Sequence, residues 1–358
     1  MPQHLPLHQT HQAAGASFTD FFGWEIPERF SSIEPEYETL CHSVGLLDWS
    51  CSVVLELRGD DRVRFLHGMV TNDIKSLWAG KGCRAASLTP QGRLVADLHV
   101  FCLEESLLLT AEASVRERLE PSLRKYIIGN RPALADRSGE LALLSLQGPK
   151  AMELLETIQS TPLENAFEHC QLSVSGNPVR VCRINRTPAG GFDLLVPREN
   201  LLQTWQFILE QGRPLGIQPV GFASFNILRI EAGIPLFGFD MEENTLPIEA
   251  GLEQNAISFN KGCYIGQESV ARITYRGHVN RKLSGLLLAG DRAAAKGDKV
   301  FKGEQEVGWI TSSAVSPRLR RAIALGYLRR EVSEPGARVL IHCGTGTIEA
   351  EVTALPFS

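Results

Sequence analysis

Residues 86–104 read ASLTPQGRLVADLHVFCLE, two apolar runs separated by Pro90-Gln91-Gly92. This pattern predicts a β-hairpin, because a Pro/Gly turn joins two segments rich in strand-forming residues. Residues 106–113 (SLLLTAEA) continue as a further strand, and residues 113–127 have the apolar spacing of a helix. Upstream, residues 52–59 alternate like a strand and residues 60–70 have helical spacing. The first part of the chain therefore mixes strands and helices.

A similar mixture of strand and helix patterns begins again after residue 139. We predict strands over 140–148, 177–185 and 191–197, and helices over 149–159 and 199–212, in addition to a helix over 32–44 near the start. Strands and helices that do not alternate strictly are typical of the α+β class. The sequence therefore predicts an α+β fold with two ferredoxin-like layers.

The last part of the chain has a different pattern. Five short strands separated by Gly, Pro and charged turns are expected: KLSGLLLAG (282–290), QEVGWITSSA (305–314), AIALGYLRR (322–330), ARVLIHCG (337–344) and TIEAEVTAL (347–355). Many short strands at even spacing predict a small β-barrel. We place one α+β module at residues 1–278 and the barrel at 279–358.

Composition narrows the function classes. The 358 residues carry a net charge of −5, which argues against a nucleic-acid partner. None of the eight cysteines has C-x-x-C spacing, and no Cys/His cluster has the spacing of a zinc site, so we expect no metal. No signal peptide and no apolar run of about 18–20 residues is present, which argues against a membrane partner. We expect a cytoplasmic monomer.

Common catalytic motifs are also missing. The sequence contains no G-x-x-x-x-G-K-[ST] phosphate loop, no H-E-x-x-H and no G-x-S-x-G, and GTGT at 344–347 lacks the context of a dinucleotide fingerprint. Classical NTPase, dehydrogenase, zinc-protease and hydrolase functions are therefore disfavoured.

The segment KGCYIGQE (261–268) is the most unusual in the chain, because it places Cys263 between two glycines and beside Lys261. If a helix begins at Ile265, its N-terminus and the lysine favour the thiolate form of the cysteine. Such a thiol can attack an electrophile, ligate a soft metal or sense redox state. The alternative is a tight loop with an incidental cysteine.

KGCYIGQE, followed by RGHVNRKL (276–283), resembles the signature of the YgfZ-type folate-binding proteins. These are relatives of the glycine-cleavage T-protein that take part in iron–sulfur cluster assembly or repair. The resemblance to the wider superfamily covers nearly the whole chain, through FFGWEIPERF (21–30), FLHGMVTNDI (65–74) and RIEAGIPLFGFDMEENTLPIEAGL (229–252). It implies two interlocked α+β subdomains around a central folate channel, followed by a barrel. It also implies tetrahydrofolate or a one-carbon derivative as ligand, and iron–sulfur assembly or client proteins as partners.

The resemblance implies site residues position by position. Asp97 matches an acidic position beside the reactive folate nitrogens, although Ala96 replaces the first aspartate of that motif. Asp193 falls where T-proteins carry a glutamate that holds the pterin, and Phe225 falls where they carry an arginine. Two further residues match the R-x-E-A-G segment and are candidates for ligand contact or for an internal ion pair: Arg229 and Glu231.

In the KGCYIGQE segment we expect Cys263 to be the functional thiol, near the folate channel, with Lys261 lowering its pKa or contacting an anion. Tyr264 would pack or stack, and Gln267 and Glu268 would hold the loop or contact a partner. The alternative function is that of an aminomethyltransferase or another folate-dependent one-carbon transferase. Two positions, 96 and 225, differ from those of T-proteins, and the cysteine is foreign to them, so we favour the YgfZ-type interpretation. This interpretation leaves open whether the protein is an enzyme.

Overall fold

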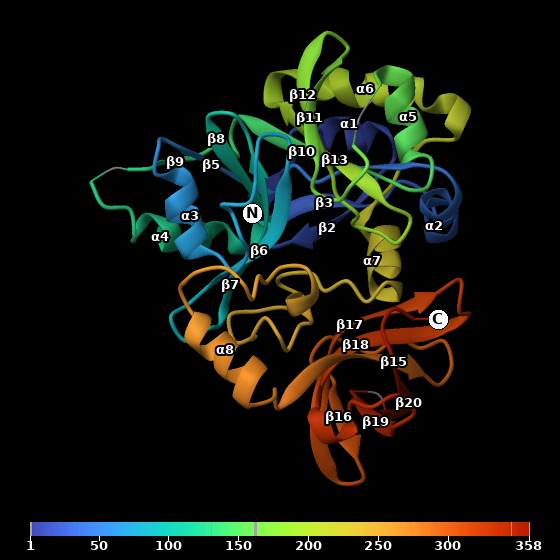
Figure 1. Cartoon of the computed structure of the whole chain (residues 1–358). Helices are drawn as coiled ribbons and strands as arrows, with labels where there is room; N and C mark the ends of the chain where they lie inside the picture. Colours follow the sequence, from blue (N-terminus) through green and yellow to red (C-terminus); the bar gives the residue numbers. More distant parts are fainter. Residues whose placement is uncertain (1, 130, 161–162, 345, 358) are drawn as a thin grey trace.

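The computed structural model describes residues 2–129, 131–160, 163–344 and 346–357. Two sheets with their helices form the upper part of the molecule in Figure 1, and a barrel forms the lower part. Within the described residues, no helix has both the length and the apolar character needed to cross a bilayer.

The first sheet has the strand order β6-β7-β8-β5-β9. Its strands are β5 (Val53–Arg58), β6 (Gly82–Leu88), β7 (Leu94–Cys102), β8 (Ser106–Ala111) and β9 (Ala133–Asp136), accompanied by the helices α3 (Arg62–Met69) and α4 (Arg116–Arg124). The predicted hairpin is β6–β7. Along β7, Ala96 and Leu98 are fully buried in the hydrophobic core on one face of the first sheet. Asp97 and His99 alternate with them and therefore point to the opposite face.

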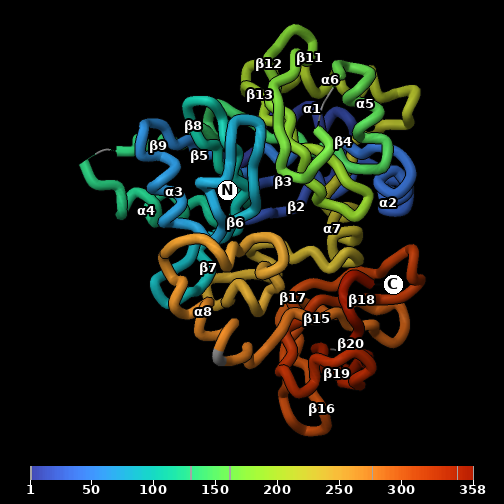
Figure 2. The backbone as a smooth tube through the Cα atoms, in the orientation of Figure 1, coloured from blue at the N-terminus to red at the C-terminus, as the bar shows by residue number. Residues whose placement is uncertain are grey.

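The second sheet has the order β11-β12-β13-β10-β4-β14. It consists of β4 (Gly45–Asp48), β10 (Leu141–Gln147), β11 (His169–Val174), β12 (Asn177–Arg183), β13 (Gly191–Pro197) and β14 (Gln218–Pro219), with α5 (Ala151–Ile158) and α6 (Leu201–Gln211). Strand β4 precedes the whole first sheet in the chain, yet it pairs with β10 of the second. The two halves are therefore interlocked, as Figure 2 shows.

A small third sheet lies at the start of the chain, in the order β1-β3-β2. It contains β1 (Gln3–His4), β2 (Ser17–Phe21) and β3 (Trp24–Arg29), followed by α2 (Ile33–His42), and α1 (His8–Ala13) connects β1 to β2. Leu5 and Leu7, between β1 and α1, are buried. These two side chains fasten the N-terminal segment to the rest of the molecule.

The C-terminal barrel is closed by six strands in the order β15-β18-β17-β16-β19-β20. They are β15 (Arg281–Leu288), β16 (Lys299–Lys302), β17 (Gln305–Ser316), β18 (Arg321–Arg329), β19 (Arg338–Cys343) and β20 (Gly346–Thr353). The predicted α+β class with a C-terminal barrel is confirmed. The sequence missed β16, because four residues rich in lysine give little apolar signal.

Two helices connect these bodies. Helix α7 (Phe222–Glu231) is buried over most of its length and contacts α2, β3 and the barrel strand β17. The segment that follows crosses between the upper sheets and the barrel before it reaches α8 (Gln267–Arg276) (Figure 2).

Candidate functional site

Charged side chains gather between the first and second sheets. On the first sheet, Arg84 of β6 contacts Asp97 of β7 through two hydrogen bonds, Nε to Oδ1 at 2.9 Å and Nη2 to Oδ2 at 2.7 Å. Both side chains are largely buried, with 13% and 15% exposed. Burial alone would lower the pKa of the Arg84 guanidinium, but the Asp97 carboxylate raises it. The pair is a bidentate ion pair at the edge of the inter-sheet space.

A second arginine links the two sheets. The Arg186 guanidinium donates to both carboxylate oxygens of Asp193 on β13, and its Nη1 donates to Oε1 of Glu112, just after β8, at 2.9 Å. Burial opposes its charge, but the two carboxylates outweigh that effect and raise the pKa of Arg186. Asp193 also accepts a hydrogen bond from Ser145 Oγ, and Glu112 accepts one from Trp49 Nε1.

His99 lies beside these groups on β7. Burial and the nearby Arg186 charge lower its pKa to about 4. The imidazole is therefore neutral at neutral pH, and it offers one N–H donor and one lone pair to the inter-sheet space.

Arg84, Asp97, His99, Glu112 and Arg186 line a pocket of about 80 Å³, the central cavity, and Asp193 is not among the lining residues. Its wall is formed by Arg84, Asp97, His99, Thr110, Ala111, Glu112, Ile184, Asn185, Arg186, Phe225, Arg229 and Ile234–Phe237. Among the described residues, no group hydrogen-bonds the Thr110 hydroxyl, although this residue is only 3% exposed. A buried hydroxyl without a partner on a cavity wall is a place where a ligand can bind.

Two larger cavities adjoin the central one. The outer cavity, of about 460 Å³, shares Arg84, Ile234 and Pro235 with it and continues along the barrel. The α2 cavity, of about 640 Å³, shares Ile234 and contains a second buried hydroxyl, that of Thr187, for which the described residues supply no partner. Because Arg84 lines both the central and the outer cavity, its side chain stands between the two.

Arg229 and Glu231 contact protein groups. The Arg229 guanidinium pairs with Asp240 and donates to Ser312 Oγ of β17 at 2.6 Å, although one edge of the side chain reaches the central cavity. Glu231 accepts hydrogen bonds from Tyr37 and Ser316. Both side chains therefore fasten α7 to its neighbours.

The KGCYIGQE segment lies elsewhere. Tyr264 packs in the core that contains Ala96 and Leu98, on the face of the first sheet opposite to Asp97. Lys261 is buried, and its ammonium donates to the backbone carbonyls of the α3 end: His67, Val70 and Asn72. No described residue of 261–268 lines the central, outer or α2 cavity.

This placement corrects the expectation that Cys263 lies near the folate channel. The Cys263 side chain is exposed, and the Lys261 ammonium is engaged by three carbonyl oxygens. Burial lowers the pKa of Lys261 to about 8. Gln267 and Glu268 form the first turn of α8, and Glu268 is exposed. The segment holds α8 against α3 and the β6–β7 turn, where Gly266 adopts φ +83° and a Cβ would lie 2.6 Å from the Thr89 carbonyl oxygen.

The sequence indicated Asp97, which lines the central cavity, and Asp193, which pairs with Arg186 but does not line it; it did not indicate Arg84, Glu112 or Arg186. The period-two alternation of residues 94–100 places Asp97 and His99 on one face, and that signal was available. No local signal indicated the Arg186–Glu112 contact, because it joins two loops that follow strands of different sheets.

Comparison with known families agrees with the architecture. The family model described as "GCVT N-terminal domain" matches residues 7–261, and the model described as "Glycine cleavage T-protein C-terminal barrel domain" matches residues 281–358. A protein of this fold, with a polar cavity between two interlocked sheets, is a member of the T-protein class.

Individual relatives agree with this family assignment. An aminomethyltransferase of Halothermothrix orenii is 30% identical, with 98% of this chain and 99% of the relative covered, and one of Chloroherpeton thalassium is 32% identical, with 99% and 98% covered. The crystal structure of the glycine cleavage system aminomethyltransferase T from Bartonella henselae superimposes with a TM-score of 0.91 at 26% identity, covering 100% of this chain and 98% of that one. The chain belongs to the glycine-cleavage T-protein family. The superfamily resemblance is thereby confirmed, whereas the narrower YgfZ-type assignment stays a prediction.

Proposed function

We propose that this chain binds tetrahydrofolate or a one-carbon derivative between its two sheets and transfers a one-carbon unit, as an aminomethyltransferase does. The observation that carries the proposal is the pair of carboxylates Asp97 and Glu112 on the wall of one cavity, beside the Arg186 guanidinium that Asp193 holds in place. Relatives that match the chain from end to end are named aminomethyltransferases, and aminomethyltransferases use tetrahydrofolate.

The residues present suit a reduced folate in kind. A pterin offers several N–H groups, for which carboxylates and the free Thr110 hydroxyl are fitting acceptors, and Phe225 and Leu236 give the cavity apolar wall. The glutamate tail of a folate is anionic and suits the cations Arg84 and Lys282, which line the outer cavity.

The volume of the cavity limits how a folate can bind. The central cavity of about 80 Å³ is smaller than the roughly 300 Å³ of ordinary small-molecule sites, whereas the outer cavity of about 460 Å³ is not. We propose that the Arg84 side chain moves away from Asp97 when the ligand enters, which joins the two cavities and frees a carboxylate for the ligand.

In this proposal Asp97 accepts a hydrogen bond beside the reacting nitrogens, and Asp193, which also accepts from Ser145, fixes the Arg186 guanidinium on the cavity wall. Phe225 supplies no charge where T-proteins have an arginine, but the guanidinium of Arg186 lines the same cavity. When bound, the folate supplies the nitrogens that accept the one-carbon unit. We place the end of this folate-binding module near residue 278, between the end of α8 at Arg276 and the start of β15 at Arg281.

The transfer assay tests this function directly. The chain is mixed with tetrahydrofolate and a lipoyl carrier protein bearing the aminomethyl group, and ammonia release is measured. The wild type should turn over, and Asp97→Asn should lower kcat/KM by about tenfold or more, because a charged hydrogen-bond acceptor is worth about 1.5–3 kcal/mol. Asp60→Asn, an exposed position before α3, is the matched control and should leave the rate unchanged. A wild type that neither binds tetrahydrofolate nor releases ammonia contradicts the proposal.

The predicted support of iron–sulfur cluster assembly or repair remains a second candidate. The observation that favours it is the exposure of Cys263, since the other free cysteines in the described part of the chain are buried or half-buried. An exposed thiol can make a transient contact with a cluster or with a cluster-carrying protein.

This second candidate has its own test. In cells that carry Cys263→Ser in place of the wild type, iron–sulfur enzymes should lose activity, whereas the half-buried Cys343→Ser control should keep it. Unchanged iron–sulfur enzyme activity in the Cys263 variant would leave the cysteine without this role. Because neither Cys263 nor Cys343 lines the central cavity, ammonia release should be the same in the wild type and in both variants.

A further inference from the structure

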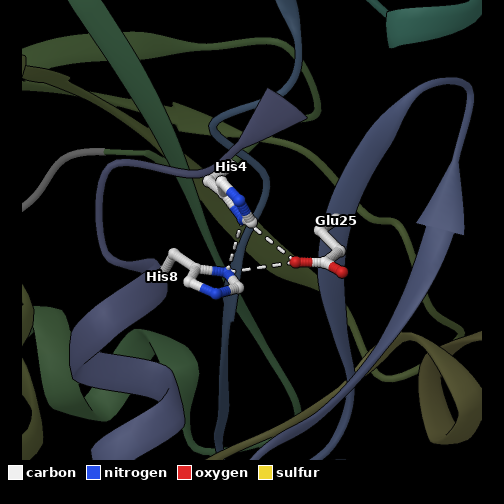
Figure 3. Close-up of side chains that lie close together, drawn as sticks. All are labelled: His4, His8 and Glu25. Carbon is white, nitrogen blue, oxygen red and sulfur yellow. Dashed lines mark hydrogen bonds and ion pairs between the residues drawn. The ribbon is translucent and has the colours of Figure 1, made fainter. Parts of the chain in front are cut away.

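A cluster of metal-ligating side chains lies outside the candidate site. His4 ends β1, His8 begins α1 and Glu25 is the second residue of β3. The parallel register of β1 and β3 pairs the Cα atoms of His4 and Glu25 directly. Figure 3 shows the three side chains pointing toward one another from these three elements.

The distances between the three inner atoms are those of a metal site. His4 Nδ1 lies 3.0 Å from Glu25 Oε2 and 3.3 Å from His8 Nδ1, and His8 Nδ1 lies 3.8 Å from Glu25 Oε2. A triangle with these sides has room for an ion about 2.0 Å from all three corners, slightly above their plane. Zinc takes His nitrogen and carboxylate oxygen at roughly 2.0–2.2 Å, with the three ligands forming one face of a tetrahedron.

Hydrogen bonds alone account poorly for this convergence. Each Nδ1 can carry a single proton, and that proton can serve either the other ring or the carboxylate at one time. The His4 nitrogen has both the His8 nitrogen and the Glu25 oxygen within hydrogen-bond or ion-pair distance. One cation at the centre satisfies all three lone pairs and balances the carboxylate charge.

The backbone holds the three groups in place before any ion binds. Leu5 follows the first histidine and is 3% exposed, Leu7 precedes the second and is also 3% exposed, and Ile26 follows the glutamate and is 1% exposed. Side chains whose neighbours are anchored in a core lose little freedom on binding a metal. The Phe18 ring, 4.4 Å from the ring of His8, further limits its rotation.

We propose that His4 Nδ1, His8 Nδ1 and Glu25 Oε2 bind one divalent transition-metal ion of the zinc type. The His4 side chain is 59% exposed, so the fourth coordination position faces solvent and takes water or a donor atom of another molecule. The ion joins β1, α1 and β3 and therefore ties the N-terminal segment to the third sheet. This site is independent of the proposed folate chemistry.

From the sequence alone, no metal site was predicted. The spacing of His4 and His8 is that of two ligands on adjacent turns, but the third ligand belongs to a strand much further along the chain. Only the β1–β3 register brings Glu25 to the two histidines.

A zinc titration of the metal-free full chain tests the proposal. Calorimetry should show one zinc ion per chain, and zinc should raise the Tm. His8→Ala and Glu25→Gln should each weaken zinc binding by at least about tenfold, since even indirect changes at metal sites cost roughly 10–100-fold. Binding should also weaken in acid, because imidazole must be neutral to ligate a metal.

Two controls exclude other binding groups. His42→Ala removes an exposed histidine that also pairs with a glutamate, Glu38 at 3.1 Å, and it should bind zinc like the wild type. Cys263→Ser should also bind normally, and cobalt in place of zinc should show no thiolate charge-transfer band. The proposal is overturned if the wild type binds no zinc, if both ligand variants keep wild-type affinity, or if Cys263→Ser abolishes binding.

Discussion

Two arginines determine the electrostatics of the central cavity. Arg84 pairs with Asp97, and Arg186 pairs with Glu112 and Asp193, so two cations offset most of the charge of three carboxylates. A buried carboxylate without such a partner would carry a large desolvation cost. The same pairs account for the small volume of the central cavity, because two guanidinium groups occupy the inter-sheet space.

The buried His169 makes stability depend on pH. Its Nε2 donates to the Cys102 carbonyl oxygen at 3.0 Å and its Nδ1 accepts from Arg180 at 3.1 Å, so a proton on Nδ1 would face a cation. Burial and the Arg180 charge lower its pKa to about 4. Between about pH 6.5 and 4 the unfolded state binds the proton more readily, and this histidine's contribution to stability is lost as the pH falls.

Urea unfolding at pH 7 and pH 5 measures this effect. Between pH 7 and pH 5 the wild type should lose about 2 kcal/mol of unfolding free energy through His169 alone. The His169→Gln variant should lose less than the wild type by about this amount. An equal loss in both proteins would show that His169 does not remain neutral in the folded state.

Lys261 should be structural. Its ammonium donates to three backbone carbonyls at the end of α3, and the residue is only 8% exposed. Lys261→Met should lower the unfolding free energy by about 2–4 kcal/mol, since it leaves buried acceptors without donors. Lys296→Met, which breaks a half-exposed ion pair with Glu242, should change it by less than about 1 kcal/mol. Similar losses in the two variants would contradict this role.

Among the secondary-structure elements, α7 has the most consequential contacts. It runs from the second sheet to the barrel, and its Arg229 and Glu231 side chains bond to barrel residues Ser312 and Ser316. The guanidinium of Arg229 is 1% exposed and its partner Asp240 is fully buried at the side chain. This ion pair fixes the segment after α7, which forms one wall of the central cavity.

Removing one member of that pair should therefore be costly. Asp240→Asn leaves the Arg229 charge buried without a carboxylate, and the expected loss of unfolding free energy is about 3–5 kcal/mol. Glu242→Gln, which removes the partner of Lys296 on the surface, is the control and should cost less than about 1 kcal/mol. Chemical denaturation measures both, and a small loss in Asp240→Asn would show that water reaches Arg229.

Local apolar patterns predicted individual helices and strands but not which strands pair with one another. Apolar periodicity predicted the β6–β7 hairpin, α6 and five barrel strands, because each has a clear repeat of its own. It did not reveal that β4 joins the second sheet, since four consecutive buried residues carry no alternation. Strand pairing between distant segments is decided by packing and is not written in a local repeat.

For the whole molecule, the candidate site exists only because the two sheets interlock. The Arg186–Glu112 contact joins the second sheet to the first, and α7 closes the cavity from a third direction. The sequence could indicate Asp97 and Asp193 through the family resemblance, whereas their arginine partners come from the tertiary structure. Cys263 shows the converse, because it belongs to an unusual local motif but is exposed and does not line that cavity.

The central claim is that a reduced folate occupies the space between the two sheets, and calorimetric titration with tetrahydrofolate tests it most directly. The wild type should bind one molecule per chain and gain thermal stability. Thr110→Val, which removes a cavity hydroxyl that no described group uses, should bind about 2–10-fold more weakly without loss of stability. Thr204→Val removes an equally buried hydroxyl of α6, likewise unpaired among the described residues and away from the central cavity, and it should bind like the wild type. Absence of both heat and thermal shift in the wild type, or equal affinity in all three proteins, would contradict this account.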